Sequence, residues 1–211
     1  MEAYYRQRLT PPQQAAYHAM KTGFTALAPR FPVPLLDRET LSNLFFLLRL
    51  DCPEIFYVTG FSYRYAPGAE NAELLPEYLF DKGKIRQHQQ ALSARVEKLV
   101  RPLRQLTPLE QERAIHDFIC ENVRYDKLKK PYSHEIIGPL GQGVGVCEGI
   151  AKSVKILCDA LGLWCMIAVS ENNPAQGVKD RHAWNIVRLD GQYYHLDATF
   201  DATLSQSGVV R

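Results

Sequence analysis

Cys147, His182 and Asp197 are the residues in this sequence whose types and order could activate a sulfur nucleophile. A thiolate needs a base to take and return its proton, and a carboxylate beside a histidine holds the imidazole in the tautomer that does so. Cys147 follows the glycine-rich stretch 143–145 and precedes an apolar helical pattern that ends at Gly162. Backbone N–H groups and the helix dipole at such a start favour a thiolate and can hold an oxyanion. This position predicts a nucleophilic cysteine.

The alternative for Cys147 is a small buried side chain, which is the interpretation we favour for Cys158 and Cys165. Cys158 lies on the face of the expected helix that carries Ala151 and Val154, so it belongs to a packing stripe. The chain has five cysteines, an odd number, without a C-x-x-C pair. The sequence therefore predicts neither a zinc site nor a redox pair, and it favours a reduced, cytoplasmic setting.

His182 begins an apolar segment that is followed by an Asp-Gly dipeptide at 190–191, a strong signal for a two-residue hairpin turn. Counting back from that turn along a returning strand over residues 192–200 places Trp184 opposite Asp197. His182 and Asp197 then share one face of the hairpin and lie diagonally, within reach of a hydrogen bond. The register therefore predicts a base and the carboxylate that orients it.

His195 is the alternative base, because it lies on the same expected face as Asp197. We favour His182, because it stands at the start of a strand beside the polar loop 170–181, where an active-site cleft would open. Apolar residues near the pair argue against a purely solvent-facing hairpin: Trp184, Ile186 and Leu196. No two of the other histidines have metal-ligand spacing, and we expect surface or capping roles for them: His18, His88, His116 and His134.

The first part of the chain, residues 1–106, is predicted to be a mainly helical region with a small β-hairpin. We expect its helices over 11–28, from a cap at Asp37 or Thr40 through Leu50, and over 82–101, with a proline-rich connector after the first. We expect its strands over 55–65, with a bulge at Gly60, and over 74–80.

The second part, residues 107–211, carries all three candidate residues. It opens with a capping box that has proline at the first helical position, Thr-Pro-Leu-Glu at 107–110. The helix behind this box should stop near Val123. A long loop then reaches Gly145, and a loop of that length inside a compact domain is usually functional.

Composition excludes several classes of protein. The 211 residues are 46% hydrophobic and 23% charged, with a net charge of +2, which is typical of a globular chain. The densest basic cluster is short and adjoins Asp126, so we predict no nucleic-acid partner; it consists of Lys127, Lys129 and Lys130. The longest apolar run near the start, 44–48, ends at charged residues, and no signal peptide is visible. We therefore expect no membrane insertion and a cytoplasmic location.

The sequence resembles the transglutaminase-like superfamily in blocks that occur in the order Cys, His, Asp. The blocks are G-V-C-E-G-I-A at 145–151, H-A-W-N-I-V at 182–187, D-G-Q-Y-Y at 190–194 and H-L-D-A-T-F-D at 195–201. The resemblance as a whole covers roughly residues 107–201, about half of the chain, and several blocks in one order are more specific than any single block. The segment Asp-Cys-Pro-Glu at 51–54 and the aromatic strand after it also resemble the lead-in region of bacterial members.

This resemblance implies a papain-like α+β fold, in which a helix bearing the cysteine packs on an antiparallel sheet that presents the histidine and the aspartate. It implies acyl transfer through a thioester, with Cys147, His182 and Asp197 as the catalytic triad and no cofactor. Gln142, five residues before the cysteine, is a candidate oxyanion donor, and Trp184 is a candidate for substrate contact. No cluster of carboxylates suggests the calcium sites of the animal cross-linking enzymes.

Three functions stay open at this stage. We favour a cysteine hydrolase, a protease or amidase acting on a peptide or protein substrate. The second is transglutaminase-type transfer to an amine by the same triad, and the third is a protein-binding module that keeps the fold without turnover. Family members commonly continue with further strands after the aspartate, so we expect the transglutaminase-like catalytic domain, 107–211, to be truncated at its C-terminus. The oligomeric state is not predicted.

Overall fold

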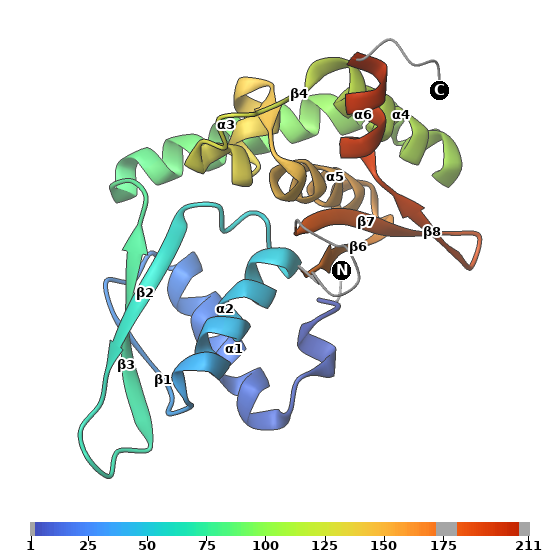
Figure 1. Cartoon of the computed structure of the whole chain (residues 1–211). Coiled ribbons are helices and arrows are strands. Elements are labelled where there is room, and N and C mark those ends of the chain that lie inside the picture. The colour runs from blue at the N-terminus through green and yellow to red at the C-terminus, as the bar shows by residue number, and fades with distance from the viewer. Residues whose placement is uncertain (1–2, 172–180, 207–211) are drawn as a thin grey trace. The chain divides into compact units, whose positions relative to one another are not determined.

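The computed structural model describes residues 3–171 and 181–206 of the chain, and contacts divide it into two compact units, 2–87 and 88–211 (Figure 1). The division falls inside the helix α3 (Lys82–Val100), earlier than the boundary that we expected before Thr107. In the second unit, the part of α3 from residue 88 onward lines a cavity with the next helix through His88, Ala91, Leu92 and Arg95. In the described ranges, no helix combines the length and the apolar composition of a membrane span.

The first unit contains two packed helices and an antiparallel sheet of three strands in the order β1-β3-β2. Its elements are the short 3₁₀ turn Arg6–Arg8, α1 (Pro11–Thr25), β1 (Phe31–Pro34), α2 (Arg38–Asp51), β2 (Val58–Arg64) and β3 (Asn71–Tyr78). Of the two expected caps of α2, Asp37 is the one used, because its carboxylate accepts a hydrogen bond from Thr40 N at 2.8 Å. The core side chains are fully buried: Met20, Phe24, Leu41, Leu44, Leu48 and Leu74.

The proline-rich connector contains a strand that we did not expect. Pro32 and Pro34 of β1 pair with Glu73 and Asn71 of β3. Proline has no N–H to give to a sheet, so its presence argued against a strand, but alternate positions of an edge strand tolerate it. The predicted bulge at Gly60 is confirmed, because the register of β2 against β3 shifts between Val58 and that glycine.

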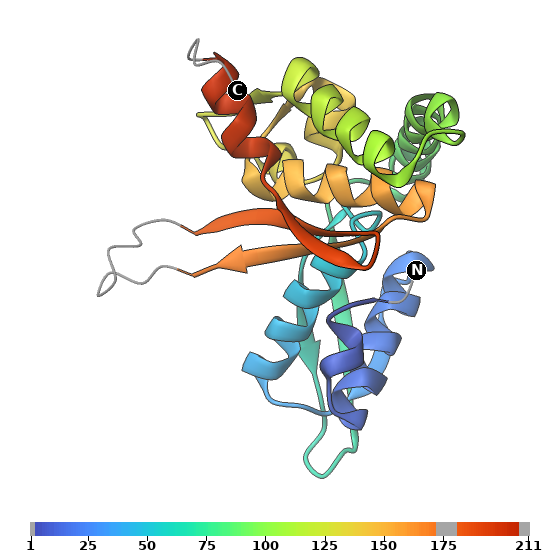
Figure 2. The ribbon, with the colours of Figure 1, turned by 90° about the vertical axis from the view of Figure 1, so that its right-hand side faces the viewer.

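The second unit is an α+β fold in which a long helix lies on an antiparallel sheet. The sheet has the order β6-β7-β8, α5 lies along one of its faces, and α4 packs on α5 (Figure 2). The elements that follow α3 are the 3₁₀ turn Arg101–Leu103, α4 (Pro108–Asn122), β4 (Arg124–Tyr125), the 3₁₀ turn Pro131–His134, the π-helical turn Ile137–Gln142, β5 (Val144–Gly145), α5 (Cys147–Leu161), β6 (Trp164–Ser170), β7 (His182–Leu189), β8 (Gln192–Leu196) and α6 (Ala198–Gln206). This arrangement confirms the predicted fold class.

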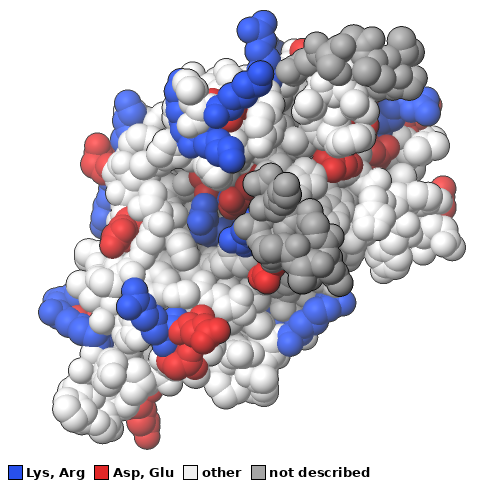
Figure 3. Space-filling view, in the orientation of Figure 1, with Lys and Arg blue, Asp and Glu red and all other residues white. Residues whose placement is uncertain are grey.

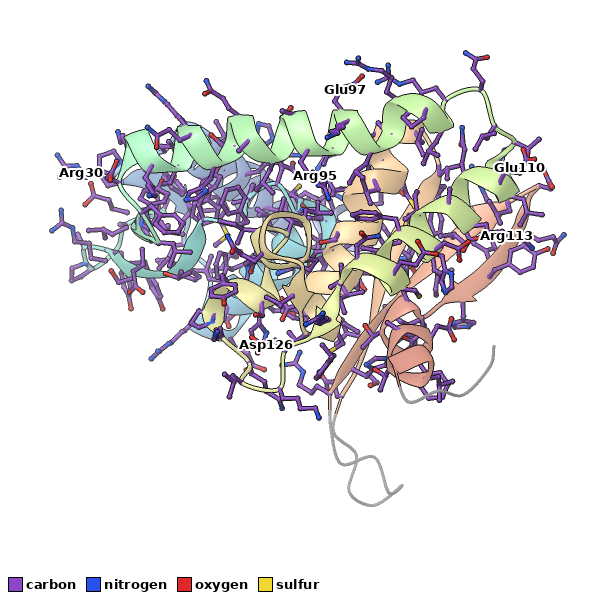
Figure 4. All side chains as sticks on the ribbon, turned by 90° about the horizontal axis from the view of Figure 1, so that it is seen from above. Arg30, Arg95, Glu97, Glu110, Arg113 and Asp126 are labelled. Atoms are coloured by element: carbon purple, nitrogen blue, oxygen red, sulfur yellow. The ribbon has the colours of Figure 1, made fainter. Side chains whose placement is uncertain are left out.

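Charged side chains fix the ends of the outer helices. Thr107 and Glu110 form the predicted capping box of α4, with Thr107 N donating to Glu110 Oε2 at 2.9 Å. Figure 4 labels Glu110 at the start of α4 and Glu97 on α3, where Glu97 pairs with Arg101 and Arg104 at 3.3 and 2.7 Å. On the face drawn in Figure 3, acidic and basic side chains are interspersed and do not form a field of one sign.

The hairpin that carries His182 follows the predicted register over most of its length. Asp190 and Gly191 have φ angles of 49° and 79°, the left-handed conformation that a tight hairpin turn requires. The returning strand, however, ends at Leu196, and α6 starts at Ala198, so the expected strand over 192–200 is wrong at its end. Asp197 caps the new helix, because its carboxylate accepts from Phe200 N at 3.1 Å.

Candidate active site

Cys147 is the first residue of α5, with Val146 as the N-cap, and it differs from the other cysteines in exposure. Four of the five cysteines are buried, whereas Cys147 is half-buried. Burial raises the pKa of the Cys52 thiol to about 11. A hydrogen bond with Cys165, together with burial, raises the pKa of the Cys158 thiol. Cys52 and Cys158 therefore stay protonated at neutral pH, and Cys147 is the thiol that solvent can reach.

The glycines around Cys147 allow the preceding loop to lie directly against the start of α5. Val146 N donates to Ser133 O at 3.0 Å, which fixes the loop to the N-cap. A side chain on Gly149 would overlap the same Ser133 carbonyl, and one on Gly145 would come within 2.6 Å of Pro139 Cγ. The glycine spacing of the motif thus reflects close backbone approach, which holds Cys147 in place.

Buried charges hold the same loop against the second turn of α5. Lys152 is fully buried, and its ammonium group contacts Glu135 at 2.9 Å and Glu148 at 2.7 Å. Glu148 also lies 3.5 Å from His134 Nδ1. A buried ion pair of this kind is costly to break, so it fixes the loop relative to the residue after Cys147.

The base of the loop is held by Asp126, which Figure 4 labels beyond the end of α4. Its carboxylate accepts from Leu128 N and Lys130 N, each at 3.0 Å, and from the Ser133 hydroxyl. The hydrogen bond from Ser133 and those from the backbone lower the pKa of the Asp126 carboxyl. The loop is therefore ordered by its own polar groups, as its expected functional role would require.

His182 and Asp197 are joined by a short hydrogen bond. His182 Nε2 lies 2.6 Å from Asp197 Oδ2, and the two side chains are 36% and 31% exposed. The backbone N–H of His182 donates to Ser170 Oγ at 3.1 Å, which anchors the start of β7. With Nε2 directed at the carboxylate, Nδ1 is the ring nitrogen left to face a reacting group. The structure therefore brings together the expected base and orienter.

Trp184 covers one side of the His182 ring and also contacts His195, the alternative base. The two rings stack at a centroid distance of 5.7 Å and an interplanar angle of 19°. Trp184 Nε1 donates to His195 Nδ1 at 2.8 Å, so His195 is held by the tryptophan while Asp197 is held by His182. The contact of Trp184 with a substrate stays a prediction.

The register between α5 and the sheet decides where Cys147 lies. Asn185 Nδ2 donates to Ala151 O at 2.9 Å. Lys155 Nζ donates to Cys165 O at 3.1 Å, and Cys165 is the residue of β6 that pairs with Val187 of β7. Lys155 is thus level with Val187, and Ala151 is level with Asn185, so α5 and β7 run in the same direction. One more turn, about 6 Å, leads from Ala151 to Cys147.

The first turn of α5 therefore points toward the end of the sheet where β7 begins with His182. Side chains alternate along a strand, so His182 does not share the face on which Asn185 meets α5. The approach of the Cys147 thiol to the His182 ring stays a prediction.

The comparison with known families concerns the second half of the chain. Residues 97–198 match the family model described as Transglutaminase-like superfamily. This part of the chain belongs to the transglutaminase-like superfamily. No curated protein matches the chain.

Three solved structures are similar to the chain at low sequence identity. A TGase has 14% identity and a TM-score of 0.45, with 81% of this chain and 50% of that chain covered. A proposed cysteine protease from Cytophaga hutchinsonii has 17% identity and a TM-score of 0.41, with 66% and 61% covered. The periplasmic domain of TgpA from Pseudomonas aeruginosa has 17% identity and a TM-score of 0.43, with 66% and 57% covered. The chain thus spans between half and about three fifths of the length of these structures.

Gln142 lines a cavity of the transglutaminase-like domain. It is the last residue of the π-helical turn, it is exposed, and it lines a cavity of about 440 Å³ with residues of α3 and α4. Arg95, labelled in Figure 4, lines the same cavity and lies over the Phe118 ring at 5.6 Å. None of Cys147, His182 and Asp197 lines this cavity. The role of Gln142 as an oxyanion donor stays a prediction.

His116 takes part in a cluster that sequence reasoning missed. Its ring lies 3.0 Å from Asp201 of α6, 3.1 Å from Asp117 and 3.5 Å from Cys120 Sγ. The hydrogen bonds with Cys120, Asp117 and Asp201 raise the pKa of His116 to about 9. The cluster ties α6, which Asp197 caps, to α4 of the transglutaminase-like domain. The only local signal was a histidine and a cysteine four residues apart beside an apolar helical face. In the described ranges, no group of three or more His, Cys, Asp and Glu side chains is placed to hold a metal ion.

Proposed function

We propose that the transglutaminase-like domain catalyses acyl transfer on peptide or amide substrates through a thioester on Cys147, with hydrolysis as the outcome. The observation that carries this proposal is the 2.6 Å hydrogen bond between His182 Nε2 and Asp197 Oδ2. It occurs at the end of the sheet toward which the first turn of α5 extends. A solvent-accessible cysteine at a helix start and an oriented histidine are the two parts that thiol catalysis needs.

In the proposed reaction, His182 Nδ1 takes the proton of the Cys147 thiol, and the thiolate attacks the substrate carbonyl carbon. Backbone N–H groups in the first turn of α5 stabilise the oxyanion. The tetrahedral intermediate collapses, the C–N bond breaks, and the imidazolium gives its proton to the leaving amine. Water then attacks the thioester carbonyl, again with His182 as the base, and releases the acid and the thiol. Asp197 stabilises the imidazolium in both halves.

Alkylation by iodoacetamide followed by peptide mass spectrometry tests the activated thiol directly. At pH 6 to 7, we expect Cys147 to react faster than Cys52 and Cys158 in the folded chain. The His182→Ala variant should alkylate Cys147 more slowly than the unaltered chain, whereas His195→Ala is the matched control and should keep the unaltered rate, because His195 lies on the same hairpin but bonds to Trp184. Equal rates at Cys147 and the buried cysteines would eliminate the enzyme and leave a binding module.

A second assay separates hydrolysis from transfer. The chain is incubated with a glutamine donor peptide and a labelled primary amine, with Cys147→Ala as the blank. Release of ammonia without incorporation of the label supports hydrolysis. Incorporation of the label would replace the proposed hydrolysis by amine transfer, with the same three residues at work.

A further inference from the structure

A groove in the first unit lies between α2 and the outer strand β2. Its volume is about 560 Å³, and it is lined by Arg38, Ser42, Phe45, Gly60, Phe61, Ser62, Tyr63 and Tyr65. The three α2 residues are spaced by four and three positions, so they share one face of that helix. The β2 residues 60–63 are consecutive. Because neighbouring side chains on a strand point to opposite faces, a wall made of consecutive residues includes the backbone edge of the strand.

The edge of β2 that β3 does not cover carries backbone groups available for pairing. In the described part of the chain, β2 pairs only with β3, in the order β1-β3-β2. Phe61 stands opposite Pro76. Proline cannot donate an N–H, so this position fits a non-hydrogen-bonded pair, in which the N–H and C=O of Phe61 point away from β3. Alternation then gives the same outward direction to Tyr63.

The pairing of β1 with β3 also indicates that the backbone groups of Phe61 and Tyr63 point away from β3. Pro32 of β1 stands opposite Glu73, and a proline again fits a pair without hydrogen bonds. The backbone groups of Glu73 therefore face β2, where its partner is Arg64. The next pair along β2, Tyr63 with Leu74, is consequently the non-hydrogen-bonded kind. Prolines on two strands thus agree that Phe61 and Tyr63 direct their backbone groups to the outer edge.

Aromatic rings and one cation form the rest of the groove. Phe61 contacts Phe45 of α2 edge to face at 5.5 Å, and the Tyr63 ring follows at 6.5 Å from Phe61. These rings offer apolar area to side chains at alternate positions of an extended chain. Arg38 is exposed and makes no ion pair with a described residue, while Arg64, on the opposite face of β2, contacts Glu73 at 2.6 Å.

We infer that this groove binds an extended polypeptide with apolar residues at alternate positions, which adds to the edge of β2 as a fourth strand with one carboxylate at Arg38. The outward N–H and C=O groups of Phe61 and Tyr63 supply main-chain hydrogen bonds. The aromatic rings receive apolar side chains at every second position, and Arg38 selects an acidic residue by charge. The site consists entirely of residues 38–65, so it does not depend on the proposed chemistry at Cys147.

Selection of linear seven-residue peptides displayed on phage, with the full chain as bait, tests the inference. We expect enriched peptides to carry apolar residues at alternate positions and an acidic residue toward one end. Synthetic copies should bind the Arg38→Glu variant at least about tenfold more weakly, because an attraction becomes a repulsion. Arg64→Gln is the matched control, and binding to it should stay within about twofold, because Arg64 lies on the opposite face.

N-methylation of the selected peptide tests the added strand on the unaltered protein. Only every second amide of an added strand faces β2. Methylation of those amides should weaken binding about tenfold or more, and methylation of the amides between them should change it little. Binding should also slow hydrogen exchange at the amides of Phe61 and Tyr63. No enriched peptide, no alternation in the methylation series, unchanged exchange or equal binding to Arg38→Glu would each overturn the inference.

Discussion

Asp197 connects the chemistry of the site to the stability of the fold, and two substitutions separate these roles. Its Oδ2 accepts from His182 Nε2 at 2.6 Å, and its Oδ1 accepts from Phe200 N at 3.1 Å. Asp197→Ala removes both bonds. Asp197→Asn keeps an oxygen for Phe200 N, but it replaces the charged acceptor beside the imidazole by an amide N–H donor. Asparagine and aspartate are equally good helix caps.

The stability effect follows from the cap. Loss of a capping side chain costs about 1 kcal/mol, and in a chain of this size we expect Asp197→Ala to lower the melting temperature by about 2–4 °C. Asp197→Asn keeps the cap, so it should melt about 2–4 °C above Asp197→Ala. Circular dichroism or differential scanning calorimetry measures this difference.

The effect on reactivity follows from the charge. A hydrogen bond to an ionised group contributes about 1.5–3 kcal/mol and a neutral one about 0.5–1.5 kcal/mol. His182 and Asp197 are 36% and 31% exposed, so solvent screens the pair, and we take the lower end of the difference. A loss of about 1.4 kcal/mol corresponds to an about tenfold lower rate of alkylation. Alkylation of Cys147 by iodoacetamide at pH 6 should therefore slow about tenfold in Asp197→Asn and at least as much in Asp197→Ala.

Asp190→Asn is the control, because it removes a carboxylate from the turn of the same hairpin and asparagine tolerates the left-handed conformation there. This variant should match the unaltered chain in both measurements. The reasoning is refuted if Asp197→Asn alkylates as fast as Asp190→Asn. It is also refuted if the two Asp197 variants melt at the same temperature.

Three further predictions concern the support of the site. Gly149→Ala should lower the free energy of unfolding by about 1–3 kcal/mol in urea, because its methyl group would overlap a backbone carbonyl, whereas the Gly141→Ala control should cost less. Lys152→Met should destabilise by about 3–5 kcal/mol, and adding Glu135→Gln should recover part of that loss; full additivity in a double-mutant cycle would contradict the buried pair. His116 has a pKa of about 9 in the folded chain, above its ordinary value of 6.5, so its contribution is fully present below pH 6.5 and is lost as pH rises through 9. Urea titrations at pH 6 and pH 10 should show about 1–2 kcal/mol less stability at the higher pH, after a discount for the exposed carboxylate partners, and His116→Gln should flatten this difference.

The parts of the site that could be predicted from sequence are those with local signals. The glycines before Cys147 and the apolar stripe after it indicate a helix that starts at the cysteine, and α5 does start there. The Asp-Gly turn determined the register of the hairpin, and alternation alone then set His182 diagonal to Asp197. These features depend on neighbours within a few residues, so no tertiary information was needed.

The parts that could not be predicted depend on long-range contacts or on one residue with two roles. Asp197 fits the alternating pattern of the strand and also caps a helix, and the chain becomes helical one residue later, at Ala198. β1 is stabilised by β3, about forty residues away, and its prolines conceal the strand pattern. His116 meets Asp201 across 85 positions, a contact for which the sequence holds no periodic signal. The peptide around 172–180, where we expected a polar loop, lies outside the described residues.

The parallel pairing of β4 with β5 closes the loop before the cysteine at its base. Tyr125 pairs with Gly145, and Asp126 N donates to Gly145 O at 3.0 Å, so both ends of the intervening segment are joined two residues before Cys147. Farther in, residues 133–135 are fixed to α5, whereas 127–130 are exposed. Side-chain substitutions at 127–130 should therefore leave the sulfur in place, because this stretch projects its side chains into solvent while its backbone stays tied to Asp126.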